Sequence, residues 1–167
     1  SQLSTVFNVG ISTLGTTLFL SLVILAMNRF IQEKLYAEIE AAEKERILQI
    51  PILQRFIAEV LRILPPNPIV SRRVTKDVVI DGILFPKDTE FTIPLCAFCH
   101  DSRVFPEPAS FCIDRPNLLN NPNLIPFLVG LRDCPGKQMV YRVLLFVISE
   151  MVRNYRIVAI SPLNDYQ

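Results

Sequence analysis

The sequence predicts a mainly helical protein with a small β-sheet, which is an α+β fold class. Hydrophobic residues recur at helical spacing in several long stretches, and between residues 72 and 93 the spacing falls to the alternation that is typical of short strands. The chain has 167 residues and is 50% hydrophobic, so it is long enough to bury a core as a single domain. We therefore expect residues 1–167 to belong to one domain.

Charge and cysteine content narrow the possible partners. Seventeen basic and sixteen acidic residues leave a net charge of +1 without a long block of like charge, which argues against a nucleic-acid partner. Four cysteines without a visible secretion signal favour free thiols, or a thiol that binds a metal, over a disulfide framework. Because the chain starts at Ser1 rather than at a methionine, we expect a fragment or a truncated product.

The first stretch carries no charge before Arg29, and its most apolar run covers residues 14–27. A membrane span needs about 20 apolar residues, whereas a run of 10–14 is more often a buried core helix. We therefore predict a buried helix, with a membrane span over residues 5–27 as the alternative. From Arg29 on, charged residues separate apolar ones at helical spacing, such as Ile31 and Leu35, which predicts a second, surface helix.

The rest of the chain alternates between helix, strand and loop. Pro51 suits the first turn of a third helix, and the prolines that follow Leu64 must end that helix. A final helix is predicted to begin after Gly136. The remaining predicted elements are strands at 72–80, 83–85 and 90–93, a proline-rich loop at 99–126 and a last strand at 156–160.

The clearest chemical signal is the segment FLVGLRDCPG, residues 127–136, directly before the final helix. It resembles the haem-binding loop of cytochromes P450, whose pattern F-x-x-G-x-R-x-C-x-G it matches at every fixed position. With average residue frequencies, the chance of such a match in a chain of this length is on the order of 10⁻⁵. The alternative is a buried cysteine that merely precedes a core helix.

The resemblance implies haem b as the cofactor, with its iron bound by the thiolate of Cys134. A position just before a helix would place the sulfur near backbone N–H groups, which stabilise a thiolate. Arg132 would pair with a haem propionate, and Phe127 would pack beside the sulfur and keep water away. Gly130 and Gly136 would let the backbone turn tightly and lie close to the macrocycle.

A second motif of the family falls on the third helix. Glu59 and Arg62 match the pattern E-x-x-R, lie on one helix face and are followed by Leu-Pro-Pro, as in the family. The family completes this network with an arginine from the loop before the cysteine, here Arg115, although Ile113 replaces the usual proline. The implied role is structural, since the trio would hold the loops behind the haem. Two further pairs with this spacing are interpreted as solvated surface pairs: Glu43 with Arg46, and Glu150 with Arg153.

The first helix resembles the helix that crosses the distal haem face, with the pattern A/G-G-x-D/E-T. Gly10 would leave room for oxygen, and the Thr13 hydroxyl would bond it, or else bond its own helix. Ser12 stands where the family usually has an acid, and a hydroxyl is a weaker proton shuttle than a carboxylate. Arg72, five residues before Asp77, corresponds to a propionate-binding arginine of the family, or is a solvated strand residue.

Cys96, Cys99 and His100 form C-x-x-C-H, the attachment signature of c-type haem. The possibilities are a covalent haem, a zinc site with Cys112 as fourth ligand, and plain core thiols. The resemblance favours core thiols, because this segment falls where the family has a strand and then a loop. It predicts a strand at Cys96 and a turn at His100.

The resemblance extends from residue 6 to about 160 and corresponds to the C-terminal part of the cytochrome P450 fold, a partial haem domain. It implies a haem-thiolate monooxygenase that takes electrons from a reductase and inserts oxygen into an apolar small molecule. The alternatives are a truncated remnant without catalysis and a small membrane-anchored protein. The expected location is the cytoplasm or the endoplasmic-reticulum membrane.

Overall fold

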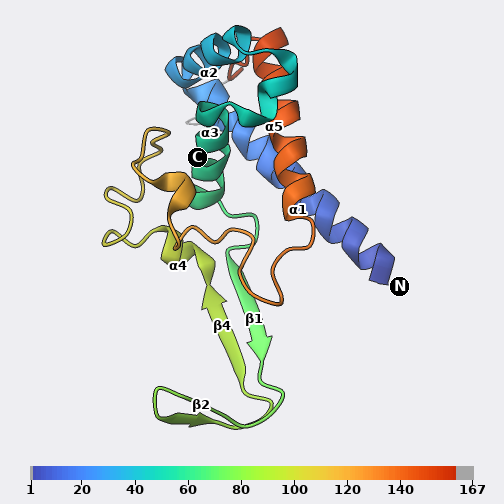
Figure 1. Ribbon diagram of the computed structural model, residues 1–167, viewed down its shortest axis with the longest axis vertical. Coiled ribbons are helices and arrows are strands. Elements are labelled where there is room, and N and C mark those ends of the chain that lie inside the picture. The colour runs from blue at the N-terminus through green and yellow to red at the C-terminus, as the bar shows by residue number, and fades with distance from the viewer. Residues whose placement is uncertain (1, 161–167) are drawn as a thin grey trace.

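The computed structural model describes residues 2–160, with side chains for residues 7–43 and 46–160. Helices dominate and two small antiparallel sheets complete the regular structure, so the predicted α+β class is confirmed (Figure 1). The helices are α1 (Gln2–Met27), α2 (Arg29–Ala41), α3 (Pro51–Ile63), α4 (Leu95–Cys99) and α5 (Lys137–Asn154), with 3₁₀ turns η1 (Lys44–Gln49) and η2 (Leu118–Asn120). The strands are β1 (Ile69–Arg73), β2 (Val78–Ile80), β3 (Ile83–Phe85) and β4 (Glu90–Pro94).

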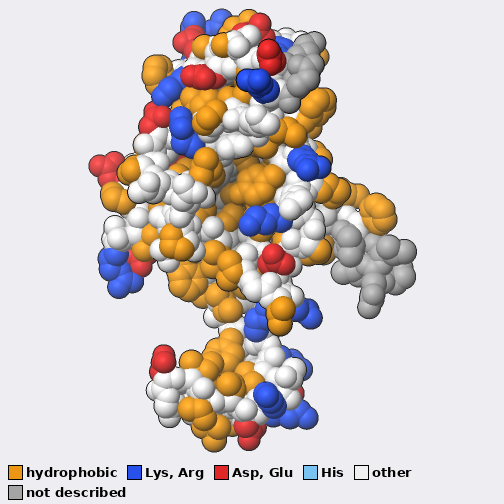
Figure 2. Space-filling view, in the orientation of Figure 1, with side chains coloured by type: hydrophobic (Ala, Val, Ile, Leu, Met, Phe, Trp, Pro, Cys, Tyr) orange, Lys and Arg blue, Asp and Glu red, His pale blue; other side chains and the backbone are white. Residues whose placement is uncertain are grey.

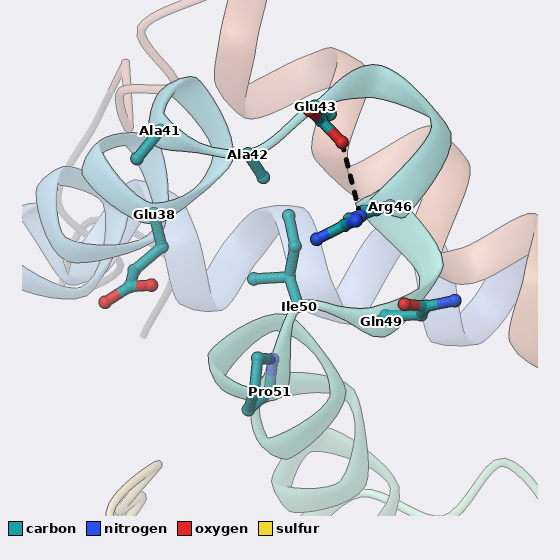
Figure 3. Close-up of a pocket in the computed structure, with 8 residues that line it drawn as sticks. All are labelled: Glu38, Ala41, Ala42, Glu43, Arg46, Gln49, Ile50 and Pro51. Carbon is teal, nitrogen blue, oxygen red and sulfur yellow. Dashed lines mark ion pairs between the residues drawn. The ribbon is translucent and has the colours of Figure 1, made fainter.

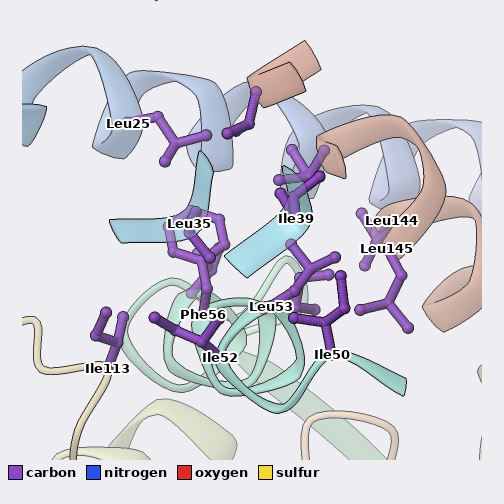
Figure 4. Packing of buried hydrophobic residues seen from close by; sticks show 14 of the residues in the cluster. Leu25, Leu35, Ile39, Ile50, Ile52, Leu53, Phe56, Ile113, Leu144 and Leu145 are labelled. Carbon is purple, nitrogen blue, oxygen red and sulfur yellow. The ribbon is translucent and has the colours of Figure 1, made fainter. Parts of the chain in front are cut away.

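The core lies where α2, α3 and α5 pack together with the C-terminal half of α1 (Figure 4). α3 is its centre, because nine of its thirteen residues are buried. α2 contributes the apolar face that its spacing predicts, including Leu35 and Ile39, and α5 contributes Leu144 and Ile148. The predicted third and final helices are thus confirmed within one or two residues of their ends.

α1 corrects the prediction of a buried helix at residues 14–27. It begins at Gln2, and its N-terminal half projects from the helical body (Figure 1). Thr17, Ser21 and Leu25 are buried, whereas Phe19 is 64% and Met27 59% exposed. The reason is that α1 packs along one side on α2, α3 and α5, and no other described element covers the rest. The segment Phe7–Met27 is long and apolar enough to cross a membrane, by length and composition alone.

The strands form two separate pairs, β1 with β4 and β2 with β3. β1 starts at Ile69, three residues earlier than predicted. Asp81 and Gly82 both have positive φ, 49° and 79°, which is the two-residue turn that an Asp-Gly pair favours between antiparallel strands. The β2–β3 hairpin projects beyond the first pair, and hydrophobic side chains are exposed on it (Figure 2).

Two further predictions were wrong. Residues 156–160 form no strand; instead, the buried Gln32 side chain pairs with the backbone of Ile157, accepting from its N–H at 2.8 Å and donating to its carbonyl at 2.9 Å. A side-chain amide thus satisfies the groups that a neighbouring strand would otherwise bind. Cys96 lies in α4 rather than in a strand, because the chain coils for one turn directly after β4, while His100 occupies the predicted turn.

Candidate functional site

The loop before α5 is held by its own backbone around Cys134. The Cys134 N–H donates to the Phe127 carbonyl at 2.9 Å, and the Cys134 carbonyl accepts from the N–H of Lys137 at 3.3 Å. Gly130 turns the loop with a φ of +84°, a conformation that favours glycine. The Cys134 thiol is half-buried and unbonded, so the loop presents a sulfur ligand at a fixed position three residues before α5.

Gly136 does not make the tight turn that was predicted for both glycines. Its backbone has an ordinary helical conformation, with φ −86° and ψ 0°. A Cβ built on it would lie 3.9 Å from Cys134 Sγ and 3.9 Å from a methyl of Val140, which are normal contact distances. The tight turn therefore explains Gly130 only, and nothing inside the described chain requires the absence of a side chain at Gly136.

Two arginines lie beside the cysteine loop. Arg72 projects from β1, and its guanidinium donates to the backbone carbonyl of Arg132 at 3.5 Å and of Ser71 at 2.8 Å. Both arginine side chains are exposed, and neither forms an ion pair within the described residues. The Arg72 guanidinium thus lies against the backbone of the cysteine loop at Arg132, and both exposed arginines can receive an anionic group.

Phe127 lies under the loop rather than in open solvent. Its ring is 5.0 Å from the ring of Tyr141 on α5, and both join the margin of the main core cluster. Burial raises the pKa of the Tyr141 phenol, so this side chain stays neutral at physiological pH. The ring thereby anchors the loop to α5, while the Phe127 carbonyl fixes the Cys134 amide.

Glu59, Arg62 and Arg115 meet in one buried network behind the loops. Arg62 Nε donates to Glu59 Oε2 at 2.8 Å, and the second guanidinium nitrogen donates to Oε1 at 2.9 Å, with both side chains fully buried. Arg115, arriving from a loop 56 residues away, donates to Glu59 Oε1 at 3.3 Å. Such a bidentate pair is geometrically specific, so the carboxylate and both guanidiniums define one another's positions.

The network also holds the chain from α4 to Arg115 through its backbone. The guanidinium of Arg62 donates to the carbonyls of Cys99 and Pro108, both at 2.8 Å, and lies 5.3 Å above the Phe105 ring. Arg115 donates to the carbonyls of Pro106, Glu107 and Ser110. Within the described residues, no buried side-chain nitrogen or oxygen is left without a partner, which is what makes buried charges tolerable.

Residues on either side of Arg115 add to this attachment. Ile113, which stands where the family has proline, is buried in the main core cluster, and its carbonyl accepts from Arg55 Nε at 3.1 Å. Asp114 is paired with Lys34 of α2 at 2.7 Å and with Arg55 of α3 at 3.7 Å. The loop is therefore fixed on both flanks of Arg115, and the isoleucine is accounted for by packing.

The three residues predicted on the oxygen side lie on the exposed half of α1. The Thr13 hydroxyl donates to the Val9 carbonyl of its own helix at 2.9 Å, which is the back-bonding alternative. Ser12 is exposed, and a Cβ on Gly10 would meet nothing within 4 Å, so the helix surface is open there. Among the described residues, no hydrogen bond joins these hydroxyls to the cysteine loop; the elements meet through the apolar cluster instead, in which Leu14 takes part.

Sequence reasoning missed several polar residues. Thr17 and Ser21 are buried and back-bond to the carbonyls one turn earlier, at 2.9 and 2.7 Å, which lets polar residues sit on the packed face of α1. Thr13, Thr17 and Ser21 follow one another at intervals of four residues, so the sequence alone indicates that they lie on one face of the helix. Gln32, the partner of Ile157, gave no signal, because that partner is 125 residues away.

The two surface pairs differ. Glu43 and Arg46 form the exposed pair that was predicted, each 71% exposed at 3.2 Å. Arg153, by contrast, is largely buried and bonds Glu150, Glu40 of α2 and the Ile39 carbonyl, so the prediction of a solvated pair was wrong there. Arg153 joins the end of α5 to α2, a role that local spacing could not reveal.

Cys96 and Cys99 of the C-x-x-C-H segment lie within α4, and His100 directly follows this helix. Cys99 is buried, which raises the pKa of its thiol, and His100 Nδ1 lies 3.0 Å from the Cys96 carbonyl. Cys99 is thus the core thiol that was predicted, whereas Cys96 is only half-buried and Cys112 is exposed. Within the part of the chain that the structure describes, no group of three or more histidine, cysteine or acidic residues is arranged to hold a metal ion.

A hollow of about 510 Å³ opens between α2, η1 and the start of α3 (Figure 3). Its wall is about half polar, with the paired Glu43 and Arg46, Glu38 and Gln49 lining it beside four apolar residues. It is built at the N-terminal end of α3, whereas the buried network lies near the C-terminal end of that helix. It therefore belongs neither to the cysteine loop nor to the arginines beside it.

Comparison with known proteins decides the family. The family model for Cytochrome P450 matches residues 1–164. The chain belongs to the cytochrome P450 family. It is 32% identical over 170 residues to the mitochondrial sterol 26-hydroxylase of Mus musculus, covering 92% of this chain and 32% of that protein. It is 28% identical over 168 residues to the probable cytochrome P450 4ac1 of Drosophila melanogaster, covering 93% of this chain and 33% of that protein. This cytochrome P450 chain thus spans about a third of the length of the curated relatives it matches.

The residues of this P450 chain fit a haem. The donor set offers one unbonded, half-buried thiol on a loop that its own hydrogen bonds hold in place. Two exposed arginines beside it suit the propionates, and Gly10 and Gly136 leave space on α1 and beside the sulfur that a side chain would fill. The thiol, the arginines and the bare position at Gly136 belong to one loop and its neighbour β1, which suits a thiolate-bound macrocycle.

Proposed function

We propose that this chain forms the haem-thiolate site of a cytochrome P450 monooxygenase, in which the Cys134 thiolate would hold the iron of haem b. The observation that carries the proposal is the half-buried, unbonded thiol in a loop locked by the Phe127 carbonyl, beside Arg132 and Arg72. When bound, the haem supplies the activation of dioxygen, which a thiolate ligand favours.

The cysteine loop has a binding role. Cys134 Sγ would hold the iron, and Arg132 and Arg72 would hold the propionates as charge-assisted donors. Phe127, anchored on Tyr141, keeps water from the sulfur side. Gly130 makes the turn that brings Arg132 and Cys134 to one side of the loop, a role that its φ of +84° supports.

The buried network has a positioning role. The Glu59 carboxylate positions the guanidiniums of Arg62 and Arg115. These in turn donate to five backbone carbonyls of the loop between Cys99 and Ser110. The segment they hold precedes the cysteine loop, and η2 lies between the two. Glu59, Arg62 and Arg115 thereby preserve the geometry of Cys134 without touching the cofactor.

α1 has the oxygen-side role. Gly10 would leave space, and the Thr13 hydroxyl, which donates to the Val9 carbonyl, would instead offer its proton on the open side of the helix. Ser12 passes protons from solvent through its exposed hydroxyl, less effectively than a carboxylate would. The substrate is an apolar small molecule and the electrons come from a reductase. The name of the mouse relative, a sterol hydroxylase, supports this class of reaction and of substrate.

The test is a haem titration of the purified chain followed by reduction and exposure to carbon monoxide. We expect one haem per chain and a thiolate-type, red-shifted Soret band, which Cys134→Ser abolishes. Cys112→Ser is the matched control, since that thiol is exposed and lies outside the loop. Absence of the band in a chain shown to be folded by circular dichroism would overturn the proposal. It would favour the alternative that the chain is a non-catalytic remnant.

A second candidate is a membrane-anchored protein, and the open face of α1 favours it. Phe7, Ile11 and Phe19 are each more than half exposed on a helix long enough to span a bilayer. Flotation of the chain with lipid vesicles tests this. Binding that is lost in the double variant Phe7→Lys, Ile11→Lys supports the anchor, and a chain that stays at the bottom of the gradient rejects it.

A further inference from the structure

A small cavity lies behind the cysteine loop; the function proposed above uses two of its lining side chains, Phe127 and Tyr141, but not the space between them. Its volume is about 130 Å³, and it is enclosed by α3, η2, the loop and the first turns of α5. Ala58, Leu119 and Phe127 contribute apolar wall. Two polar side chains also line it, Lys137 and Tyr141, and polar atoms make up more than half of its lining surface, so apolar side chains and polar groups share its wall.

Its size selects a narrow class of ligands. An engineered apolar cavity of about 150 Å³ stays free of water and binds benzene. A cavity of about 130 Å³ therefore accommodates one aromatic ring and excludes sterols and long chains. Ala58 is almost fully buried, and its small side chain leaves room for the ring between α3 and the loop.

The polar groups select the charge of the ligand. Lys137 and Tyr141 are four residues apart and so lie on one face of α5. The Lys137 ammonium is exposed and forms no ion pair within the described residues, not even with Asp133, the nearest carboxylate in sequence. The neutral Tyr141 phenol adds a second donor. Two donors on one face favour an anionic oxygen group.

We propose that this cavity binds a small aromatic monocarboxylate, with the ring between Ala58 and Phe127 and the carboxylate on Lys137 and Tyr141. The site does not depend on the proposed haem function, because none of its polar groups is assigned to the cofactor. It bears on the loop nonetheless. Phe127 lines the cavity, and its carbonyl accepts the Cys134 N–H, so an occupied cavity restrains the cysteine loop.

Ligand-observed NMR with benzoate on the full chain tests the proposal. For a ligand of this size we expect a dissociation constant on the order of 1 mM. Lys137→Ala should weaken binding about ten-fold through the lost charge-assisted bond, whereas Lys76→Ala, an exposed lysine on the β1–β2 turn, should leave it unchanged. Benzyl alcohol, the neutral probe, should bind equally well to the chain and to Lys137→Ala.

Variants that fill the cavity test whether benzoate binds inside it. Ala58→Leu should abolish benzoate binding, but this position is buried and the change can disturb the fold. Leu119→Trp should also abolish binding, and because Leu119 is 45% exposed on the rim of the cavity, this variant disturbs the fold less. Benzoate should also slow hydrogen exchange at the Cys134 amide. The proposal is overturned if benzoate does not saturate by tens of millimolar, if Lys137→Ala and Lys76→Ala bind alike, or if Leu119→Trp in a folded chain binds as well as the parent.

Discussion

α1 and α3 show opposite relations between composition and burial. α1 has no charged residue in its 26 positions, yet half of its length is open. α3 carries Glu59 and Arg62, yet nine of its thirteen residues are buried, both charges among them. The difference teaches that a helix is buried by the elements that surround it, and that charges enter a core when every donor and acceptor finds a partner.

The largest loss of stability is expected when the buried ion pair of α3 is broken. Glu59→Gln leaves the buried Arg62 without a counter-charge, and breaking a buried pair in this way destabilises a protein by about 3–5 kcal/mol. Urea unfolding of the chain measures the loss. Glu43→Gln is the matched control, because it breaks a pair with the same spacing that is 71% exposed and is expected to change stability by less than about 1 kcal/mol. Equal losses would contradict the distinction between the two pairs.

A phenylalanine on each helix sharpens the comparison. Phe56 of α3 is fully buried and packs edge-on against Phe111, with 5.7 Å between ring centroids, so Phe56→Ala should cost about 3–5 kcal/mol. Phe19 of α1 is 64% exposed, and Phe19→Ala should stay within about 0.5 kcal/mol. The same urea experiment decides. A large loss at Phe19 would mean that the outer face of α1 is covered in solution.

Gln32 tests the attachment of the C-terminal segment to α2. Gln32→Ala leaves the Ile157 backbone groups unpaired and should destabilise the chain by about 1–3 kcal/mol, with faster hydrogen exchange at the Ile157 amide. Gln138→Ala, at an exposed position of α5, is the control and should change neither. An unchanged exchange rate at Ile157 in the Gln32 variant would show that another group holds the segment.

The smallest effect concerns a carboxylate on the loop after α4. Hydrogen bonds from Arg103 lower the pKa of Asp101 to about 2. A lowered pKa in the folded chain means that this carboxylate's contribution to stability is present above its usual pKa near 3.9 and is lost as pH falls towards 2. An NMR titration should find the Asp101 midpoint near 2 and, in Arg103→Ala, back in the usual range. An Asp101 midpoint that is the same in the parent chain and in Arg103→Ala would refute the pairing.

Local pattern and long-range packing contributed differently to what the sequence could predict. The turn at Gly130, the α3 face that bears Glu59 and Arg62, and the ends of α5 follow from short-range spacing, which one sequence contains. The open half of α1 could not be predicted, because apolarity does not tell whether a covering element exists. The pairing of Gln32 with Ile157 and of Arg153 with Glu40 joins residues over 110 positions apart, and only the fold brings them together.

The most direct test of the account is the alkylation rate of each cysteine, mapped by mass spectrometry with and without haem. Without haem, Cys112 and Cys134 should react and the buried Cys99 should not, in line with its raised pKa. With haem, the account predicts that Cys134 alone is protected while Cys112 reacts as before. Haem that leaves the rate at Cys134 unchanged, or that protects Cys112 or Cys96 instead, would contradict the claim that the braced loop is where the iron binds.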